Sequence, residues 1–115
     1  KLVISTGVEY PIYLKNKENV YTLTNLKQVE KINNLLKKSK HILIIGGGLI
    51  GVETAGELSD KTPDKKNTII HPHDRLIERN PKHVSKTSEN ILKKKNVQII
   101  FNEKIIKGEI ILYLT

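Results

Sequence analysis

The sequence predicts an α/β fold in which a parallel sheet is flanked by helices. Two observations lead to this prediction. Short runs rich in Ile, Leu and Val recur along the chain and are separated by segments with helical periodicity. One unit, from His41 to His71, has about the ~30 residues of a β-α-β motif. A chain of 115 residues is long enough for one compact domain and too short for two.

Five apolar runs predict strands, at residues 1–5, 41–45, 67–71, 97–101 and 108–115. The central runs are continuously apolar rather than alternating, which is typical of parallel strands covered on both faces. Right-handed crossovers through helices on both sides of the sheet are the expected connections.

Three segments with apolar residues at helical spacing predict the helices. The first covers residues 25–39, with Asn25 as its N-cap and one apolar face formed by Leu26, Val29, Ile32, Leu35 and Leu36. The second follows a glycine cluster and runs to about Ser59, where polar residues and a proline stop it. The third covers residues 81–95, with Val84, Ile91 and Leu92 facing inward. Residues 8–19 are polar, contain a proline and predict a loop.

The glycine cluster is the strongest functional signal. Gly46, Gly48 and Gly51 fit the pattern G-x-G-x-x-G, and Gly47 adds a fourth glycine. In a dinucleotide-binding turn the first glycine permits the tight turn, the second lets a pyrophosphate approach the backbone, and the third lets the helix pack closely on the sheet. A corner that needs glycine only for its geometry is the alternative. The strand before, the helix after and the second strand favour a Rossmann-like dinucleotide site.

The end of the second strand normally carries an acidic residue that binds the adenine-side ribose. Here that position is His71, which does not repel a 2′-phosphate, so weak discrimination against NADPH is expected. Arg75 and Arg79, the two arginines of the chain, either contact a phosphate or are ordinary surface residues. His71 and His73 form an H-x-H pair, but no third ligand is evident and no metal site is predicted.

The formal net charge of +8 does not by itself predict nucleic-acid binding. Lysine contributes 18 of the 20 basic residues and is spread along the chain, with no arginine-rich run or RNA-binding aromatic motif. No apolar run approaches the ~20 residues of a membrane span. The chain has no cysteine, so it carries no disulfide or CxxC pair, which agrees with a reducing compartment. A cytoplasmic location is expected, with mitochondria left open.

The segment "GGGLIGVETAGEL" resembles the NAD(P)H-binding domain of the pyridine nucleotide-disulfide oxidoreductases, the two-dinucleotide-fold flavoproteins related to glutathione reductase and NADH oxidase. "LVISTG" is similar to the strand and turn that leave their FAD domain, and "NTIIHPHDRLIER" and "KKKNVQIIFNEKI" are similar to their later segments. His71 in "PDKKNTIIHP" looks most like the branch of apoptosis-inducing factor and the ferroptosis suppressors. Coenzyme A disulfide reductases and single-subunit NADH:quinone dehydrogenases stay open as alternatives.

The resemblance implies a division of the chain and a role for each matching residue. Residues 1–8 would be the end of an FAD-domain strand with its crossover, and residues 9–115 a C-terminally incomplete NAD(P)H-binding domain. The pyrophosphate and nicotinamide side would be lined by Gly46, Gly47, Gly48, Leu49 and Ile50. Glu53 would be the catalytic residue and would lie near the nicotinamide and the flavin. It would orient the carboxamide of the nicotinamide rather than exchange protons. The adenosine ribose would be near His71, Pro72 and Arg75, and the FAD near Thr6 and Gly7.

The chemistry implied by the resemblance is hydride transfer from NAD(P)H to FAD and then to a quinone, oxygen or a disulfide. The expected partners are an FAD domain of the same chain and a small-molecule acceptor. Nucleic acid is not expected, peripheral membrane association is left open, and the oligomeric state is not predicted. A non-catalytic nucleotide-binding or regulatory module and a basic nucleic-acid-binding scaffold stay open as alternative functions.

Overall fold

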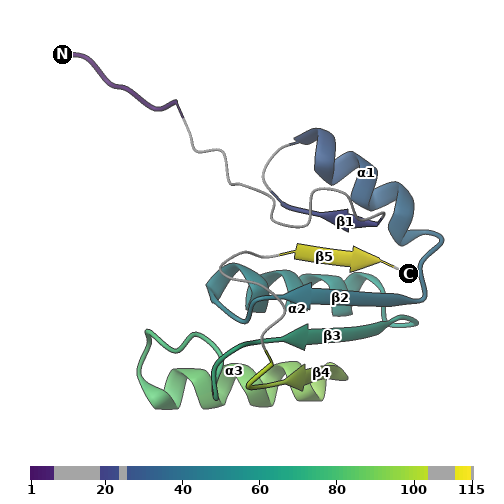
Figure 1. The fold of residues 1–115 in the computed structure, drawn as a ribbon, viewed down its shortest axis with the longest axis vertical. Coiled ribbons are helices and arrows are strands. Elements are labelled where there is room, and N and C mark those ends of the chain that lie inside the picture. The colour runs from purple at the N-terminus through teal and green to yellow at the C-terminus, as the bar shows by residue number, and fades with distance from the viewer. Residues whose placement is uncertain (7–18, 24–25, 104–110, 115) are drawn as a thin grey trace.

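The computed structural model describes residues 1–6, 19–23, 26–103 and the backbone of 111–114, and these residues form a sheet flanked by helices (Figure 1). The strands are β1 (Val20–Tyr21), β2 (His41–Ile45), β3 (Lys66–Ile70), β4 (Val97–Ile100) and β5 (Ile111–Leu114), in the spatial order β1-β5-β2-β3-β4. Strands β2, β3 and β4 are parallel, with Ile44 opposite Ile69 and Ile69 opposite Ile99. The predicted α/β class is therefore confirmed.

One strand departs from the predicted parallel arrangement. β5 pairs antiparallel with β2 and with β1, so the sheet is mixed. The reason is the length of the connection: ten residues, 101–110, separate β4 from β5. A parallel crossover needs a dozen residues or more, whereas an antiparallel strand can be reached by a shorter link.

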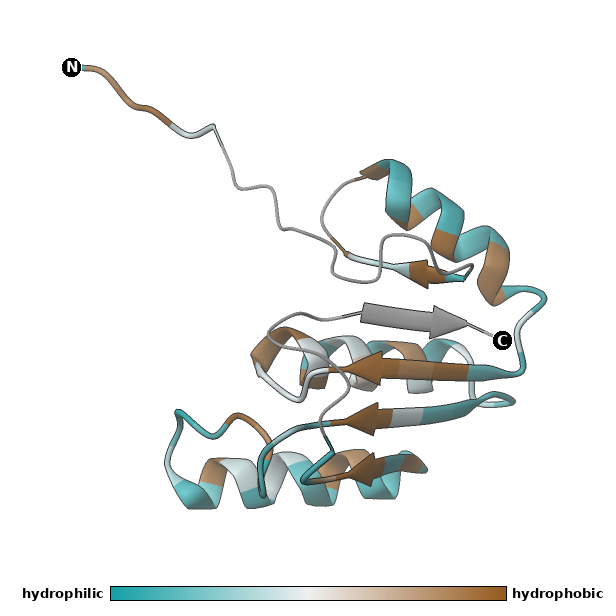
Figure 2. Ribbon diagram, viewed as in Figure 1, coloured by the Kyte–Doolittle hydropathy of each residue, from teal (hydrophilic) through white to brown (hydrophobic). Residues whose placement is uncertain are grey.

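The strand predicted at residues 1–5 is wrong. Residues 1–6 have no regular secondary structure, and Leu2, Val3 and Ile4 are exposed. A strand requires a neighbour for its backbone groups, and neither β1 nor β4 at the edges of this sheet pairs with the segment. Figure 2 shows these apolar residues on an extended segment that lies away from the sheet.

Three helices form where helical periodicity predicted them: α1 (Leu26–Leu36), α2 (Leu49–Lys61) and α3 (Lys82–Lys94). Helices α2 and α3 contact each other, and together they cover β2, β3 and β4 on one face. α2 ends where Thr62 donates both its backbone N–H and its hydroxyl to the carbonyl of Leu58. The proposed cap of α1, Asn25, lies outside the described residues, as does the predicted loop over residues 8–19 except for Asn19, which is in a turn.

The core forms between α2, α3 and the central strands. Partly buried apolar side chains pack around a group of apolar residues that are almost completely buried. This group includes Ile42, Ile44, Ala55, Ile69, Leu76 and Leu92. Two predicted inward positions are wrong, because Leu26 is 75% exposed and Ile91 is 50% exposed. The buried side of α3 is instead centred on Ser85, Glu89 and Leu92, so Ile91 lies just outside it.

Candidate functional site

The turn from β2 into α2, residues Gly46–Gly48, lies at the carboxyl end of the parallel strands. Gly46 has φ 106°, a backbone conformation that L side chains rarely adopt, and its N–H donates to the carbonyl of Ile70 at 2.9 Å. A Cβ on Gly51 would lie 1.9 Å from the Gly46 carbonyl oxygen. Glycine is therefore required at position 46 by the backbone conformation. It is required at position 51 because the start of the helix is in direct contact with the turn.

Gly48 has a different environment, because a Cβ built there meets nothing within 4 Å. Its φ of −73° is open to any residue, so neither packing nor backbone strain requires glycine at this position. Open space in front of a backbone is what a pyrophosphate needs in order to approach it.

The N-terminal end of α2 offers unpaired donors beside this space. The first intrahelical bond runs from the Val52 N–H to the Gly48 carbonyl at 3.0 Å, so the N–H groups of Leu49, Ile50 and Gly51 precede the helical ladder. No side chain caps this end of the helix. Leu49 and Ile50 are 62% and 56% exposed. Such a helix end attracts an anion through its N–H groups and its dipole.

Gly47 is held by the loop that follows β3, residues 71–80. Its N–H donates to Nδ1 of His71 at 3.0 Å, and its carbonyl accepts from the Ile77 N–H at 2.8 Å. A Cβ on Gly47 would lie 2.5 Å from Cδ2 of Leu76 and 2.9 Å from Cγ of His71. The glycine turn and this loop therefore form one packed unit.

His71 lies directly after β3 and is 4% exposed. Since the Gly47 N–H can only donate, Nδ1 of His71 must be an acceptor, and the ring is neutral with its proton on Nε2. That Nε2–H donates to Oε2 of Glu78 at 3.1 Å. Both ring nitrogens are thus occupied within the protein, and the structure places His71 against the turn.

Glu78 is the acidic group of this loop. Burial raises the pKa of Glu78, but its own backbone N–H and the nearby rings of His71 and His73 outweigh that effect, so the pKa lies below its ordinary value of 4.5. His73 Nε2 lies 3.7 Å from Oε1 of Glu78. A carboxylate therefore stands behind the histidine that occupies the usual acidic position.

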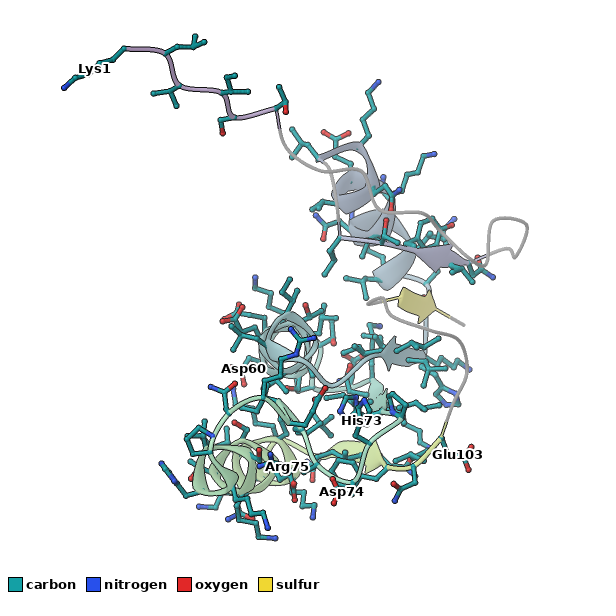
Figure 3. The ribbon with its side chains drawn as sticks, turned by 60° about the vertical axis from the view of Figure 1, so that its left-hand side comes forward. Lys1, Asp60, His73, Asp74, Arg75 and Glu103 are labelled. Carbon is teal, nitrogen blue, oxygen red and sulfur yellow. The ribbon has the colours of Figure 1, made fainter. Side chains whose placement is uncertain are left out.

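The loop also carries Pro72 and Arg75, both predicted near the ribose. Pro72 is exposed, and Arg75 donates to the backbone carbonyls of Glu78 and Asn80. Figure 3 shows His73, Asp74 and Arg75 on this loop. The residues after β4 bind the same loop, because the N–H groups of Asn102 and Glu103 donate to the carbonyls of His73 and His71, each at 3.2 Å. Arg79 is exposed.

The remaining predicted residues lie apart from this unit. Glu53 is exposed on the second turn of α2, and no hydrogen bond or ion pair holds its carboxylate within the described part of the chain. Thr6 is exposed on the N-terminal segment, which Figure 1 shows away from the glycine turn, and Gly7 lies outside the described residues.

Two other kinds of feature are absent from the described residues. No group of three His, Cys, Asp or Glu side chains is placed to hold a metal ion there, and the rings of His71 and His73 pack edge to face, 5.2 Å apart. None of the helices described is long and apolar enough to cross a membrane.

Three residues that complete the site were not predicted from the sequence: Leu76, Ile77 and Glu78. Leu76 and Ile77 are buried, and Ile77 keeps φ 42° although it is β-branched. An apolar pair inside a polar, proline-bounded loop was the available signal for them. Glu78 had no signal of its own, because only the folded loop brings it back to His71.

An α/β fold with this glycine turn at the carboxyl end of its parallel strands defines a dinucleotide-binding domain. Residues 1–111 match the family described as pyridine nucleotide-disulphide oxidoreductase. The chain belongs to that family.

Several curated relatives are similar to nearly the whole chain. The nitric oxide reductase FlRd-NAD(+) reductase of Vibrio vulnificus is 33% identical over 91% of this chain and 28% of its own length. Apoptosis-inducing factor homolog A of Dictyostelium discoideum is 38% identical, and ferroptosis suppressor protein 1 of Xenopus laevis is 32% identical, each over 90% of this chain and 28% of its own length. The predicted superfamily is confirmed, and its apoptosis-inducing factor and ferroptosis suppressor branch is represented.

A solved structure shares the fold. The water-forming NADH oxidase from Lactobacillus brevis, bound to NADH, superposes with a TM-score of 0.72 and 22% identity, over 85% of this chain and 22% of that one. The chain thus spans less than a third of the length of these proteins.

Proposed function

We propose that this chain is the NAD(P)H-binding portion of an FAD-dependent oxidoreductase that passes hydride to the flavin and on to a quinone, oxygen or a disulfide. The observation that carries the proposal is the contrast between two glycines. A Cβ at Gly51 would lie 1.9 Å from backbone, whereas a Cβ at Gly48 meets nothing. Packing explains why residue 51 is glycine. It does not explain Gly48, for which room for a ligand is the explanation.

The described residues fit a dinucleotide at this position. The pyrophosphate would be held by the N–H groups of Gly48, Leu49 and Ile50, beside the positive end of α2. Gly46 and Gly51 would shape the turn, and Gly47 would keep it attached to the loop after β3. These roles require only backbone donors, which suits an anion recognised through its charge.

The nicotinamide side would be formed by exposed residues at the start of α2. Leu49 and Ile50 would pack against the ring system and exclude water from it. The Glu53 carboxylate, exposed and without a partner in the described structure, would accept a hydrogen bond from the carboxamide and fix the face of the ring. Holding a ring at a fixed distance and angle is the protein's main contribution to hydride transfer.

The adenosine side would lie over the loop after β3. Pro72 would contact the ribose, Arg75 would offer donors that its two carbonyl partners leave unused, and His71 would support the turn from below. Thr6 and Gly7 would lie near the FAD in the complete protein. The bound flavin supplies the hydride acceptor and the onward electron transfer.

The test is an absorbance spectrum of the full-length protein, followed by anaerobic addition of NADH and then NADPH. A flavin band near ~450 nm that bleaches with either nucleotide is expected. Gly48→Ala should slow the bleaching, whereas Gly56→Ala, a matched change in open space on the same helix, should leave it unchanged. A colourless protein that still binds nucleotide would favour a non-catalytic nucleotide-binding module instead.

A further inference from the structure

We propose that His71 is a positioning residue for dinucleotide binding, whose neutral ring holds the Gly47 peptide in place and whose protonation releases it. The proposal rests on the proposed function and specifies how that site is regulated. It assigns His71 to the turn itself rather than to direct contact with the ribose.

The observed hydrogen bonds correspond to the neutral ring. Nδ1 accepts from the Gly47 N–H at 3.0 Å and Nε2 donates to Glu78 at 3.1 Å, so the ring bridges the turn and the loop. Protonation places a hydrogen on Nδ1, which then points at the Gly47 N–H. Two donors cannot share a hydrogen bond, so the Gly47 N–H loses its buried partner.

Protonation can occur without unfolding because a counter-charge is already in place. The Glu78 carboxylate lies against Nε2 and stabilises the charged ring. His73 shares that carboxylate, and the other charged side chains on the loop and beside it are those of Asp74, Arg75, Arg79 and Glu103. The end of β2 contributes only Ile44, Ile45 and glycines, and the end of β4 contributes Ile99, Ile100 and Phe101.

The consequence of losing this bond reaches the cofactor through the backbone. The Gly47 peptide is fixed at its N–H by His71 and at its carbonyl by Ile77, and the donors of Gly48 and Leu49 follow directly in the chain. When one of the two bonds is lost, those donors are no longer held in one orientation. One lost hydrogen bond corresponds to a fall of about tenfold in affinity.

Asparagine supplies a matched variant. In His71→Asn, the side-chain Oδ1 can take the place of Nδ1 as acceptor for the Gly47 N–H, and it does not titrate. We expect this variant to bind near neutral pH as the natural protein does and to lose the pH dependence. Glu78→Gln keeps an acceptor for Nε2 but removes the counter-charge, so its loss of affinity should begin at a lower pH.

The experiment measures the affinity of the full-length protein for ADP-ribose between pH 5.5 and 8 by calorimetry. ADP-ribose carries the pyrophosphate and adenosine but cannot reduce the flavin. The natural protein should lose about tenfold in affinity toward the acid end, and His71→Asn should stay flat. Equal profiles for these two proteins, or a flat profile for the natural protein, would overturn the proposal while leaving the nucleotide site intact. No binding at any pH would overturn the proposed function, and the proposal with it.

A second measurement needs no ligand. In protein labelled with ¹⁵N-glycine, the Gly47 amide resonance should shift with pH in the natural protein and stay constant in His71→Asn. A Gly47 amide that does not respond to pH contradicts the proposal, even if the variant folds poorly.

Discussion

Replacing Gly51 by alanine tests the tightest contact of the turn. The new Cβ would lie 1.9 Å from the Gly46 carbonyl oxygen and 3.0 Å from its carbon, and both atoms belong to the backbone. The Gly46 carbonyl cannot rotate away as a side chain would, because the N–H of the same residue is bonded to the carbonyl of Ile70. Overpacking of this kind costs about 1–3 kcal/mol, of which the better helix propensity of alanine returns about 1 kcal/mol at most.

Gly56→Ala is the control, because it lies in the same helix and its Cβ meets nothing within 4 Å. It should gain about 0.5–1 kcal/mol from helix propensity alone. Gly48→Ala should likewise leave stability unchanged or slightly higher, since its φ of −73° suits alanine, while it weakens nucleotide binding. The two effects separate the packing glycine from the binding glycine.

Urea denaturation of the full-length protein, followed by circular dichroism, measures these differences. Gly51→Ala and Gly56→Ala should differ by about 2 kcal/mol, with the lower urea midpoint for Gly51→Ala. If Gly51→Ala were as stable as Gly56→Ala, the helix start would not be packed against the turn as described. If Gly48→Ala bound NADH normally, the open space beside it would not be the pyrophosphate site.

Three further predictions concern the loop, the core and pH. Gly47→Ala should cost about 1–3 kcal/mol, because its Cβ would meet Leu76 and His71, and hydrogen exchange at the Ile77 N–H should become faster. Leu92→Ala should cost about 2–5 kcal/mol and Ile91→Ala less than about 1 kcal/mol, since they are 2% and 50% exposed; matched thermal melts decide this. The lowered pKa of Glu78 stabilises the fold above its ordinary value of 4.5, and this contribution is lost as pH falls through the lower folded pKa. Glu78→Gln should therefore be less stable at pH 7, with a difference from the natural protein that disappears in acid.

Continuous apolar runs made the central strands and the α/β class predictable from the sequence. Ile42, Ile44 and Ile69 are buried on the face of the sheet that α2 and α3 cover. The predictions failed where the structure of a segment depends on a neighbouring strand or on the length of a connection, rather than on its own apolar residues. The apolar residues 2–4 have no strand to pair with in the described structure, and β5 turned out antiparallel because its link to β4 is short.

The candidate site was predictable where a local backbone requirement fixes the residue type. The spacing of Gly46 and Gly51 follows from the contact between turn and helix, and it is visible in any sequence that needs that contact. The role of Gly47 was not predictable, because it depends on Leu76 and His71, which lie 29 and 24 residues later in the chain. The site residues that only tertiary structure assembles are therefore the ones that sequence patterns missed.

The position of His71 joins these two kinds of information. In dinucleotide sites an acidic residue at this point of the fold binds the ribose. Here the ring is directed at the turn, and the carboxylate of Glu78 stands behind it. A neutral acceptor at this place holds the peptide of Gly47 through its N–H. The charge that would stabilise a protonated ring is the Glu78 carboxylate, which is bonded to the other ring nitrogen than the turn, so we expect the same pair to support binding when the ring is neutral and to weaken it when the ring is charged.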